Sequence, residues 1–221
     1  VYYVKGVVKS IASEWSTTYK NGSFYMLDEG CSDKNSTAEF EAFRASASAG
    51  VDGPSIKAGD TVLVFGQLTK YKSTTYETVE KTGFIAEVTT LEEKAAAYAS
   101  DFNNANVCGT NNNTPAIGSV WTSMSQAYSE LDVFTQEYLT AVDLSAETNT
   151  SIVECITRYD RVQELYGGKS FANFMNRTYS SASRNTQSVD SNTAVIILSM
   201  LAVSFIGFAG IIALRKKKFE K

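Results

Sequence analysis

The side chains best suited to recognise a ligand are aromatic and basic residues in two polar stretches of the N-terminal part. The first stretch, residues 13–22 (SEWSTTYKNG), contains Trp15 and Tyr19. The second stretch, residues 69–76 (TKYKSTTY), contains Lys70, Tyr71, Lys72 and Tyr76. An aromatic ring can stack on a nucleobase or a sugar ring, and a neighbouring ammonium can neutralise an anionic group. The two stretches therefore indicate recognition of an extended polymer.

The segment between these stretches adds Phe24 and Tyr25 to the candidate ligand-binding residues. Neighbouring strand residues point to opposite faces, so one of the two faces a ligand. An alternative interpretation is that Trp15 and Tyr76 close the ends of the domain and that the lysines are solvated loop charges. Residues 1–88 hold nine Lys and Arg against eleven Asp and Glu, a net charge of −2. Because phosphate binding depends on several neutralised phosphates, single-stranded nucleic acid is favoured only slightly over oligosaccharide.

Catalysis is not expected from these residues. The sequence contains no histidine, which excludes Ser-His-Asp and Cys-His catalysis and histidine-ligated zinc. Glu39 and Glu41 share a strand face, but the strand is expected to be an exposed edge. The two carboxylates are therefore not expected to form a buried pair with separated pKa values. No phosphate-binding loop, dinucleotide loop or metal-spaced cysteine set is present. The sequence predicts no enzyme, no cofactor and no metal.

The three cysteines, Cys31, Cys108 and Cys155, are too few for a disulfide scaffold. If the N-terminal part is extracellular, Cys108 and Cys155 form the better pair, because both fall in the same helical region. The alternative is that all three are buried small apolar residues.

Five β-rich segments with polar turns indicate a small closed or partly closed barrel over residues 1–88. They are residues 2–12, 23–29, 37–45, 61–68 and 76–88, the last interrupted at Gly83. Gly6 lies inside the first segment, where glycine permits the bend that a long barrel strand needs.

This region resembles the OB-fold. The matching residues are VKGVV at 4–8, LDEG at 27–30 and above all AGDTVLVFGQL at 58–68, which looks like the fourth strand of that fold. The resemblance implies a ligand site on the second and third strands and on the two loops that hold the aromatic and basic residues.

Three amphipathic segments then predict a small helical bundle over residues 91–177. They are residues 91–106, with Thr90 and Glu93 as a capping box, residues 119–142 and residues 150–166. The residues Trp121, Tyr128 with Leu131, and the run at 158–160 carry a further resemblance. In them the region resembles helical segments of bacterial surface proteins of the Gram-positive type that have OB-like modules and a C-terminal anchor. The predicted fold class is multidomain α+β.

The C-terminal region predicts a membrane anchor. Residues 178–193 are small and polar and read as a flexible tether. Ala194 to Leu214 is an uncharged apolar run of 21 residues, long enough to span a bilayer. A basic cytoplasmic tail follows over residues 215–221, with Arg215, Lys216, Lys217 and Lys218 at its start. The positive-inside rule then places the N-terminal part outside the cell.

The sequence as a whole predicts a single-pass, membrane-anchored extracellular binding protein whose partners are the lipid bilayer and an extended polymer. The alternative is a structural or accessory segment that scaffolds an upstream domain such as a secreted nuclease. Because Val1 falls within a predicted strand, we expect the natural precursor to continue upstream. The sequence defines no oligomeric state.

Overall fold

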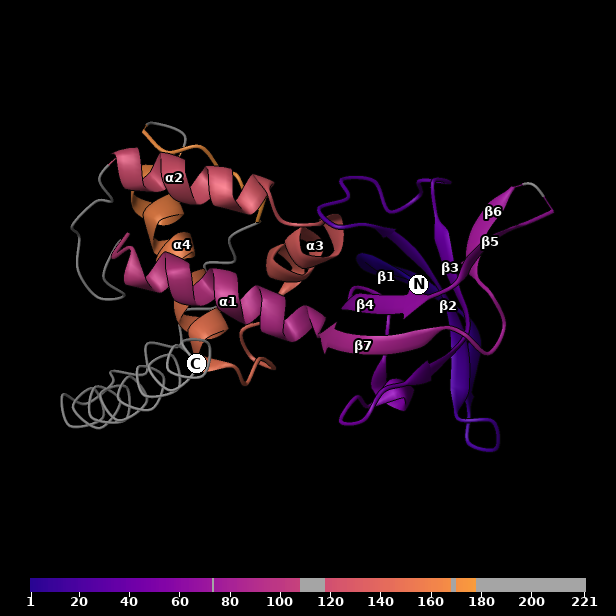
Figure 1. Ribbon diagram of the computed structural model, residues 1–221. Coiled ribbons are helices and arrows are strands. Elements are labelled where there is room, and N and C mark those ends of the chain that lie inside the picture. Colours follow the sequence, from indigo (N-terminus) through magenta and orange to yellow (C-terminus); the bar gives the residue numbers. More distant parts are fainter. Residues whose placement is uncertain (73, 108–117, 168–169, 178–221) are drawn as a thin grey trace, which may run out of the picture. The chain divides into compact units, whose positions relative to one another are not determined.

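The computed structural model describes residues 1–72, 74–107, 118–167 and 170–177 (Figure 1). These residues form seven strands: β1 (Tyr2–Ser16), β2 (Asn21–Asp28), β3 (Phe40–Ala47), β4 (Thr61–Gly66), β5 (Leu68–Tyr71), β6 (Thr75–Thr78) and β7 (Phe84–Thr89). A short 3₁₀ turn, η1 (Gly53–Ser55), precedes β4. Four helices follow: α1 (Leu91–Asn104), α2 (Gly118–Ser129), α3 (Val133–Ala141) and α4 (Thr150–Tyr166). Strands and helices belong to one unit, Val1–Tyr179.

The strands form one mixed sheet in the order β2-β1-β4-β7-β3-β6-β5. Strands β2 and β3 also pair with each other, which closes β1, β2, β3, β7 and β4 into a ring. Strand β3 runs parallel to both β6 and β7, while the other pairs are antiparallel. The β5–β6 hairpin therefore extends from the ring at the edge of β3.

The strands alternate between an inner apolar face and an outer face, as half-buried strands must. The inner face, together with Ile56 after η1, supplies a core of Val8, Phe24, Met26, Ala42, Ala45, Val62, Val64 and Ile85. Gly6 is required by a close approach between strands: a Cβ atom there would lie 2.4 Å from the carbonyl oxygen of Leu27. The bend expected at Gly6 is not where the register of β1 with β2 shifts, because those shifts lie between Val8 and Ser16.

The prediction of a five-stranded OB-like barrel followed by three helices is wrong in its element counts. The described residues form a seven-stranded mixed sheet and four helices. Residues 69–76, expected as a loop, lie mostly in the hairpin of β5 and β6, because Thr and Tyr favour strands. The expected strand over 76–88, interrupted at Gly83, is two strands, β6 and β7, separated by a turn in which the N–H of Thr82 donates to the carbonyl of Val79. The expected helix over 119–142 is two helices.

The helices begin where side chains cap their free N–H groups. Thr90 and Glu93 form the expected capping box at the start of α1. The Asp132 carboxylate accepts hydrogen bonds from the N–H groups of Phe134 and Thr135, which starts α3 as a separate helix. An aromatic core joins the helices, with Trp121 stacked on Tyr159 at a centroid distance of 5.3 Å and Phe102 fully buried.

Buried hydrogen bonds join the strand and helix regions. The Asp60 carboxylate is fully buried and accepts hydrogen bonds from the N–H groups of Lys57 and Leu91, so it links the start of β4 to the start of α1. The N–H of Val133 donates to the carbonyl of Cys31 at 2.9 Å, which links the chain after β2 to α3.

Two further contacts fix the helices to one another. Lys94 on α1 donates to Asp132 at 2.6 Å, and both side chains are largely buried. Arg177 donates to the carbonyls of Leu139, Thr140 and Val142, at the end of α3, and to Asp160 on α4. A guanidinium at a helix C-terminus satisfies carbonyls that have no partner within the helix.

The prediction of a single-pass membrane protein is corrected. No helix within the part of the chain that the structure describes has the length and apolar character needed to cross a bilayer. The anchor expected from Ala194 to Leu214, the tether over residues 178–193 and the tail over residues 215–221 lie outside the described residues. The structure therefore supports neither the anchor nor the extracellular orientation that was inferred from it.

Replacing Asp132 should destabilise the fold more than replacing an exposed partner of an ion pair. Asp132→Ala leaves the Lys94 ammonium largely buried without its carboxylate and removes the N-cap of α3, so we expect a loss of about 3 to 5 kcal/mol in the free energy of unfolding. Glu137→Ala breaks the exposed pair with Lys34 and should cost less than about 1 kcal/mol. Urea denaturation followed by circular dichroism measures both, and equal losses would contradict the assignment.

Candidate functional site

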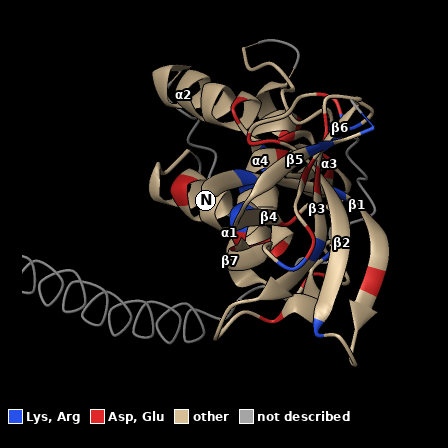
Figure 2. Cartoon of the chain, turned by 45° about the vertical axis from the view of Figure 1, so that its right-hand side comes forward, with Lys and Arg blue, Asp and Glu red and all other residues tan. Residues whose placement is uncertain are grey.

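The β5–β6 hairpin presents two exposed tyrosines, each covered by a lysine. The Lys70 ammonium lies 4.9 Å from the centre of the Tyr76 ring, and the Lys72 ammonium lies 5.0 Å from the centre of the Tyr71 ring. Tyr71 is 51% exposed and Tyr76 is 57% exposed. Basic residues gather on this hairpin, which projects from the sheet (Figures 1 and 2). The hairpin thus carries two separate lysine–tyrosine contacts: Lys70 and Tyr76 lie on one face, and Tyr71, which follows Lys70 on β5, points to the other face.

The hairpin's own pairing explains this arrangement. Lys70 and Tyr76 are directly opposed across β5 and β6, so their side chains lie on the same face. Lys72 has a φ of 45° and so begins the turn, and the N–H of Thr74 donates to the carbonyl of Tyr71. The sequence predicted these four residues as a group, and the structure places all four on the hairpin as two lysine–tyrosine pairs.

The other predicted ligand-binding residues lie elsewhere. Phe24 is buried in the core of the strand ring. Trp15 packs over η1, where a Cβ atom on Gly53 would lie 2.3 Å from its ring. Tyr19 is 76% exposed but lies at the β1–β2 turn, at the opposite end of the strand region from the β5–β6 hairpin (Figures 1 and 2). The two-loop site that the sequence suggested is therefore not assembled, and Trp15 and Phe24 are structural.

Tyr25 belongs to an acidic row on the outer face of the sheet. It is opposed to Glu41 on β3, and Glu41 is in turn opposed to Glu77 on β6. The Glu41 carboxylate, with Glu39 and Glu77 contributing less, raises the pKa of Tyr25. Burial, and after it the charges of Glu77 and Glu39, raises the pKa of Glu41. Sequence reasoning missed this row because Glu41 and Glu77 are 36 residues apart.

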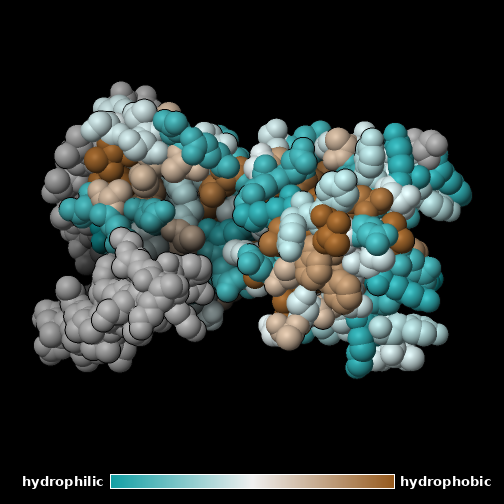
Figure 3. Space-filling model, viewed as in Figure 1, coloured by the Kyte–Doolittle hydropathy of each residue, from teal (hydrophilic) through white to brown (hydrophobic). Residues whose placement is uncertain are grey.

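A ladder of aromatic rings on β1, β4 and β7 was also missed. Tyr3, Phe65 and Phe84 are opposed across the three strands, with ring centroids 5.7 and 5.4 Å apart. Tyr3 is 70% exposed and Phe84 is 38% exposed. Apolar side chains gather on this face in the space-filling view (Figure 3). The strand partners of residues 61–66 could not be read from the sequence, so the three rings were not recognised as neighbours.

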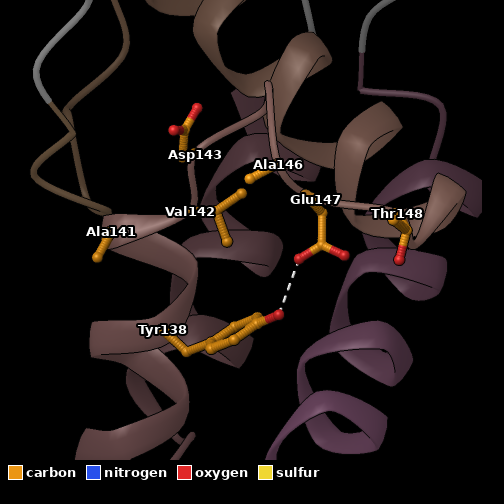
Figure 4. A pocket seen from close by; sticks show the side chains of 7 residues that line it. All are labelled: Tyr138, Ala141, Val142, Asp143, Ala146, Glu147 and Thr148. Atoms are coloured by element: carbon orange, nitrogen blue, oxygen red, sulfur yellow. Dashed lines mark hydrogen bonds between the residues drawn. The ribbon is translucent and has the colours of Figure 1, made fainter.

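A shallow pocket of about 380 Å³ lies at the end of α3 (Figure 4). The Tyr138 hydroxyl donates to Glu147 at 2.8 Å, and burial, with a smaller contribution from Glu147, raises the pKa of Tyr138 to about 12. Asp143 accepts hydrogen bonds from Ser145. Because Tyr138, Asp143 and Glu147 already bind one another or nearby groups, the pocket offers few of its polar side chains to a ligand.

The cysteines and carboxylates form no reactive or metal site in the described residues. Cys155 is a buried free thiol, and burial raises its pKa, which keeps it protonated and unreactive. Cys108 lies outside the described residues, so the bridge between Cys108 and Cys155 stays a prediction. Across these same residues, no group of three or more Cys, Asp or Glu side chains is arranged to hold a metal ion.

Comparison with known proteins found no matching family model, no similar curated protein and no similar solved structure. The OB-fold assignment and the nucleic-acid binding inferred from it therefore have no support from known proteins, and both predictions are withdrawn.

Replacing Trp15 should test its structural role. Trp15→Ala removes a half-buried side chain that packs against the strand core, and we expect a loss of about 2 to 3 kcal/mol in the free energy of unfolding. Gly53→Ala should also destabilise the protein, because its Cβ atom would meet the Trp15 ring. In the Trp15→Ala background the same Gly53→Ala change should cost little. Additive losses in a double-mutant cycle measured by urea denaturation would contradict this contact.

Removing one carboxylate of the acidic row should stabilise the protein near neutral pH. The pKa of Glu41 is raised in the folded state, so stability is lost as pH rises from the ordinary carboxyl pKa of about 4.3 through the raised value. Glu77→Gln removes one source of this repulsion and should raise the melting temperature at pH 7 by about 2 to 4 °C, the shift that about 1 kcal/mol produces in a protein of this size. At pH 3.5 the difference should vanish. A melting temperature that falls at pH 7 would refute the repulsion.

Proposed function

We propose that this chain is a non-catalytic binding protein that recognises an extended oligosaccharide through the β5–β6 hairpin. The observation that supports the proposal is the pair of exposed tyrosines, Tyr71 and Tyr76, on one projecting hairpin. Aromatic rings pack against the C–H faces of sugar rings, and exposed tyrosines supply contact area at a low cost in side-chain entropy. Lys70 and Lys72 add donors for sugar hydroxyls or acidic sugar groups.

Charge favours an oligosaccharide over a nucleic acid. The described residues of the hairpin carry two lysines, and both already lie over tyrosine rings. Binding of a phosphate backbone depends on releasing several counterions, which requires more basic groups than this surface presents. Glu77 follows Tyr76 directly on β6, so negative charge lies beside the hairpin. A sugar polymer with few charges meets no such repulsion.

Titration of the purified full chain with a glycan panel, single-stranded DNA and single-stranded RNA tests this function. We expect at least one glycan to bind with little dependence on salt. Tyr76→Ala combined with Lys70→Ala should weaken that binding about tenfold or more, because one stacked ring contributes roughly 1 to 3 kcal/mol.

Two control variants locate the site. Tyr19→Ala removes a tyrosine that is more exposed than Tyr76 and lies at the opposite end of the strand region, and it should leave the affinity unchanged. Tyr3→Ala removes an exposed ring of the aromatic ladder and should also have no effect. Loss of binding in Tyr3→Ala alone would assign recognition to the ladder. Salt-sensitive binding of nucleic acid in place of glycan, or no binding to any probe, would refute the proposal, and the second result would favour the scaffold function.

A further inference from the structure

The acidic row on the outer face of β2, β3 and β6 holds more negative charge than its surroundings balance. Glu41 and Glu77 project from directly opposed positions on two parallel strands, whose backbones lie about 4.8 Å apart. Glu77 is only 9% exposed, and its carboxylate has no hydrogen bond or ion pair with any residue that the structure describes. Glu41 likewise forms no ion pair with these residues. Two carboxylates are thus held together without a cation.

The basic side chains of the neighbouring strands are engaged with other groups. Lys9 on β1 donates to Glu39 at 2.8 Å and to the carbonyl of Ser36 at 2.9 Å. Arg44 on β3 pairs with Glu80 and lies over the Phe43 ring. Neither one therefore neutralises Glu41 or Glu77. Burying like charges beside each other costs free energy, so this arrangement is unfavourable for folding alone.

Tyr25, the third member of the acidic row, favours an organic cation as the ligand. Tyr25 lies opposite Glu41 on β2, so an aromatic ring borders the Glu41 carboxylate on the side away from Glu77. Ammonium and guanidinium groups bind aromatic faces by cation–π attraction and donate hydrogen bonds to carboxylates. A metal ion binds several oxygen ligands that lie close together around it. The described residues contain no group of three or more acidic or cysteine side chains arranged to hold a metal ion.

We propose that Tyr25, Glu41 and Glu77 form a binding site for the ammonium or guanidinium group of an organic cation. The cation would insert between the two carboxylates and lie against the Tyr25 ring. This site is separate from the Lys70–Tyr76 pair of the hairpin, because Glu77 and Tyr76 are neighbours on β6 and point to opposite faces. It does not depend on the proposed oligosaccharide function.

Nuclear magnetic resonance titration of the full chain with spermidine and with the tripeptide Gly-Arg-Gly tests the site. The neutral peptide Gly-Gln-Gly serves as the reference ligand. We expect at least one cationic probe to shift the signals of Tyr25 and Glu41, and we expect the pKa of Glu41 to fall when the probe binds. Binding of spermidine alone would identify a free polyamine as the source of the cation, and binding of the peptide alone would identify a basic protein segment.

Matched variants separate binding from general charge effects. Glu77→Gln should weaken binding tenfold or more, and since this variant is expected to fold more stably, the loss cannot come from unfolding. Glu87→Gln removes the same charge from the exposed surface of β7 and should leave the affinity unchanged. Tyr76→Ala should also leave it unchanged, which distinguishes this site from the hairpin.

Three results would overturn the proposal. In the first, neither cationic probe binds, or both bind no better than the neutral peptide. In the second, Glu87→Gln weakens binding as much as Glu77→Gln, which would show diffuse charge attraction. In the third, Ca²⁺ or Mg²⁺ displaces both probes at equal concentration, which would show that the carboxylates select a metal ion.

Discussion

The pairing of β3 determines where both candidate surfaces lie. One edge of this strand serves two partners: Phe40 and Glu41 pair with β6, while Ser46 and Ala47 pair with β7. The second pairing closes the ring of strands, and the first leaves β6 with one free edge on which β5 folds back. The parallel alignment also brings Glu41 beside Glu77. The hairpin surface and the acidic row therefore arise from the same strand contact.

The sequence predicted the parts of the fold that depend on interactions between residues close together in the chain. The capping box at Thr90 and the apolar spacing of residues 150–166 specified helices that the structure contains with nearly the expected bounds. The expected break near Gly83 also matches the gap between β6 and β7. The split between α2 and α3 was missed because the apolar spacing continues across it. The Asp132 side chain, which caps α3, was not recognised as a helix start within that pattern.

The candidate sites also differ in whether their residues are close together in the sequence. Lys70, Tyr71, Lys72 and Tyr76 were found because they are close in the sequence and stay close on one hairpin. Trp15 and Phe24 were misassigned, since residue type alone does not distinguish an aromatic ring that packs in a core from one that meets a ligand. Glu41 and Glu77 come together through strand pairing over a long sequence separation, which no local pattern records.

Arg177 has a mechanical consequence for the chain. Its guanidinium is bound to three backbone carbonyls at the end of α3 and to a carboxylate on α4. A pulling force that enters the domain through the backbone at this residue meets these bonds first. They spread the load over two helices before it reaches the strands. Force applied there would act on α3 and α4 before it reached the candidate surfaces on β2, β3, β5 and β6.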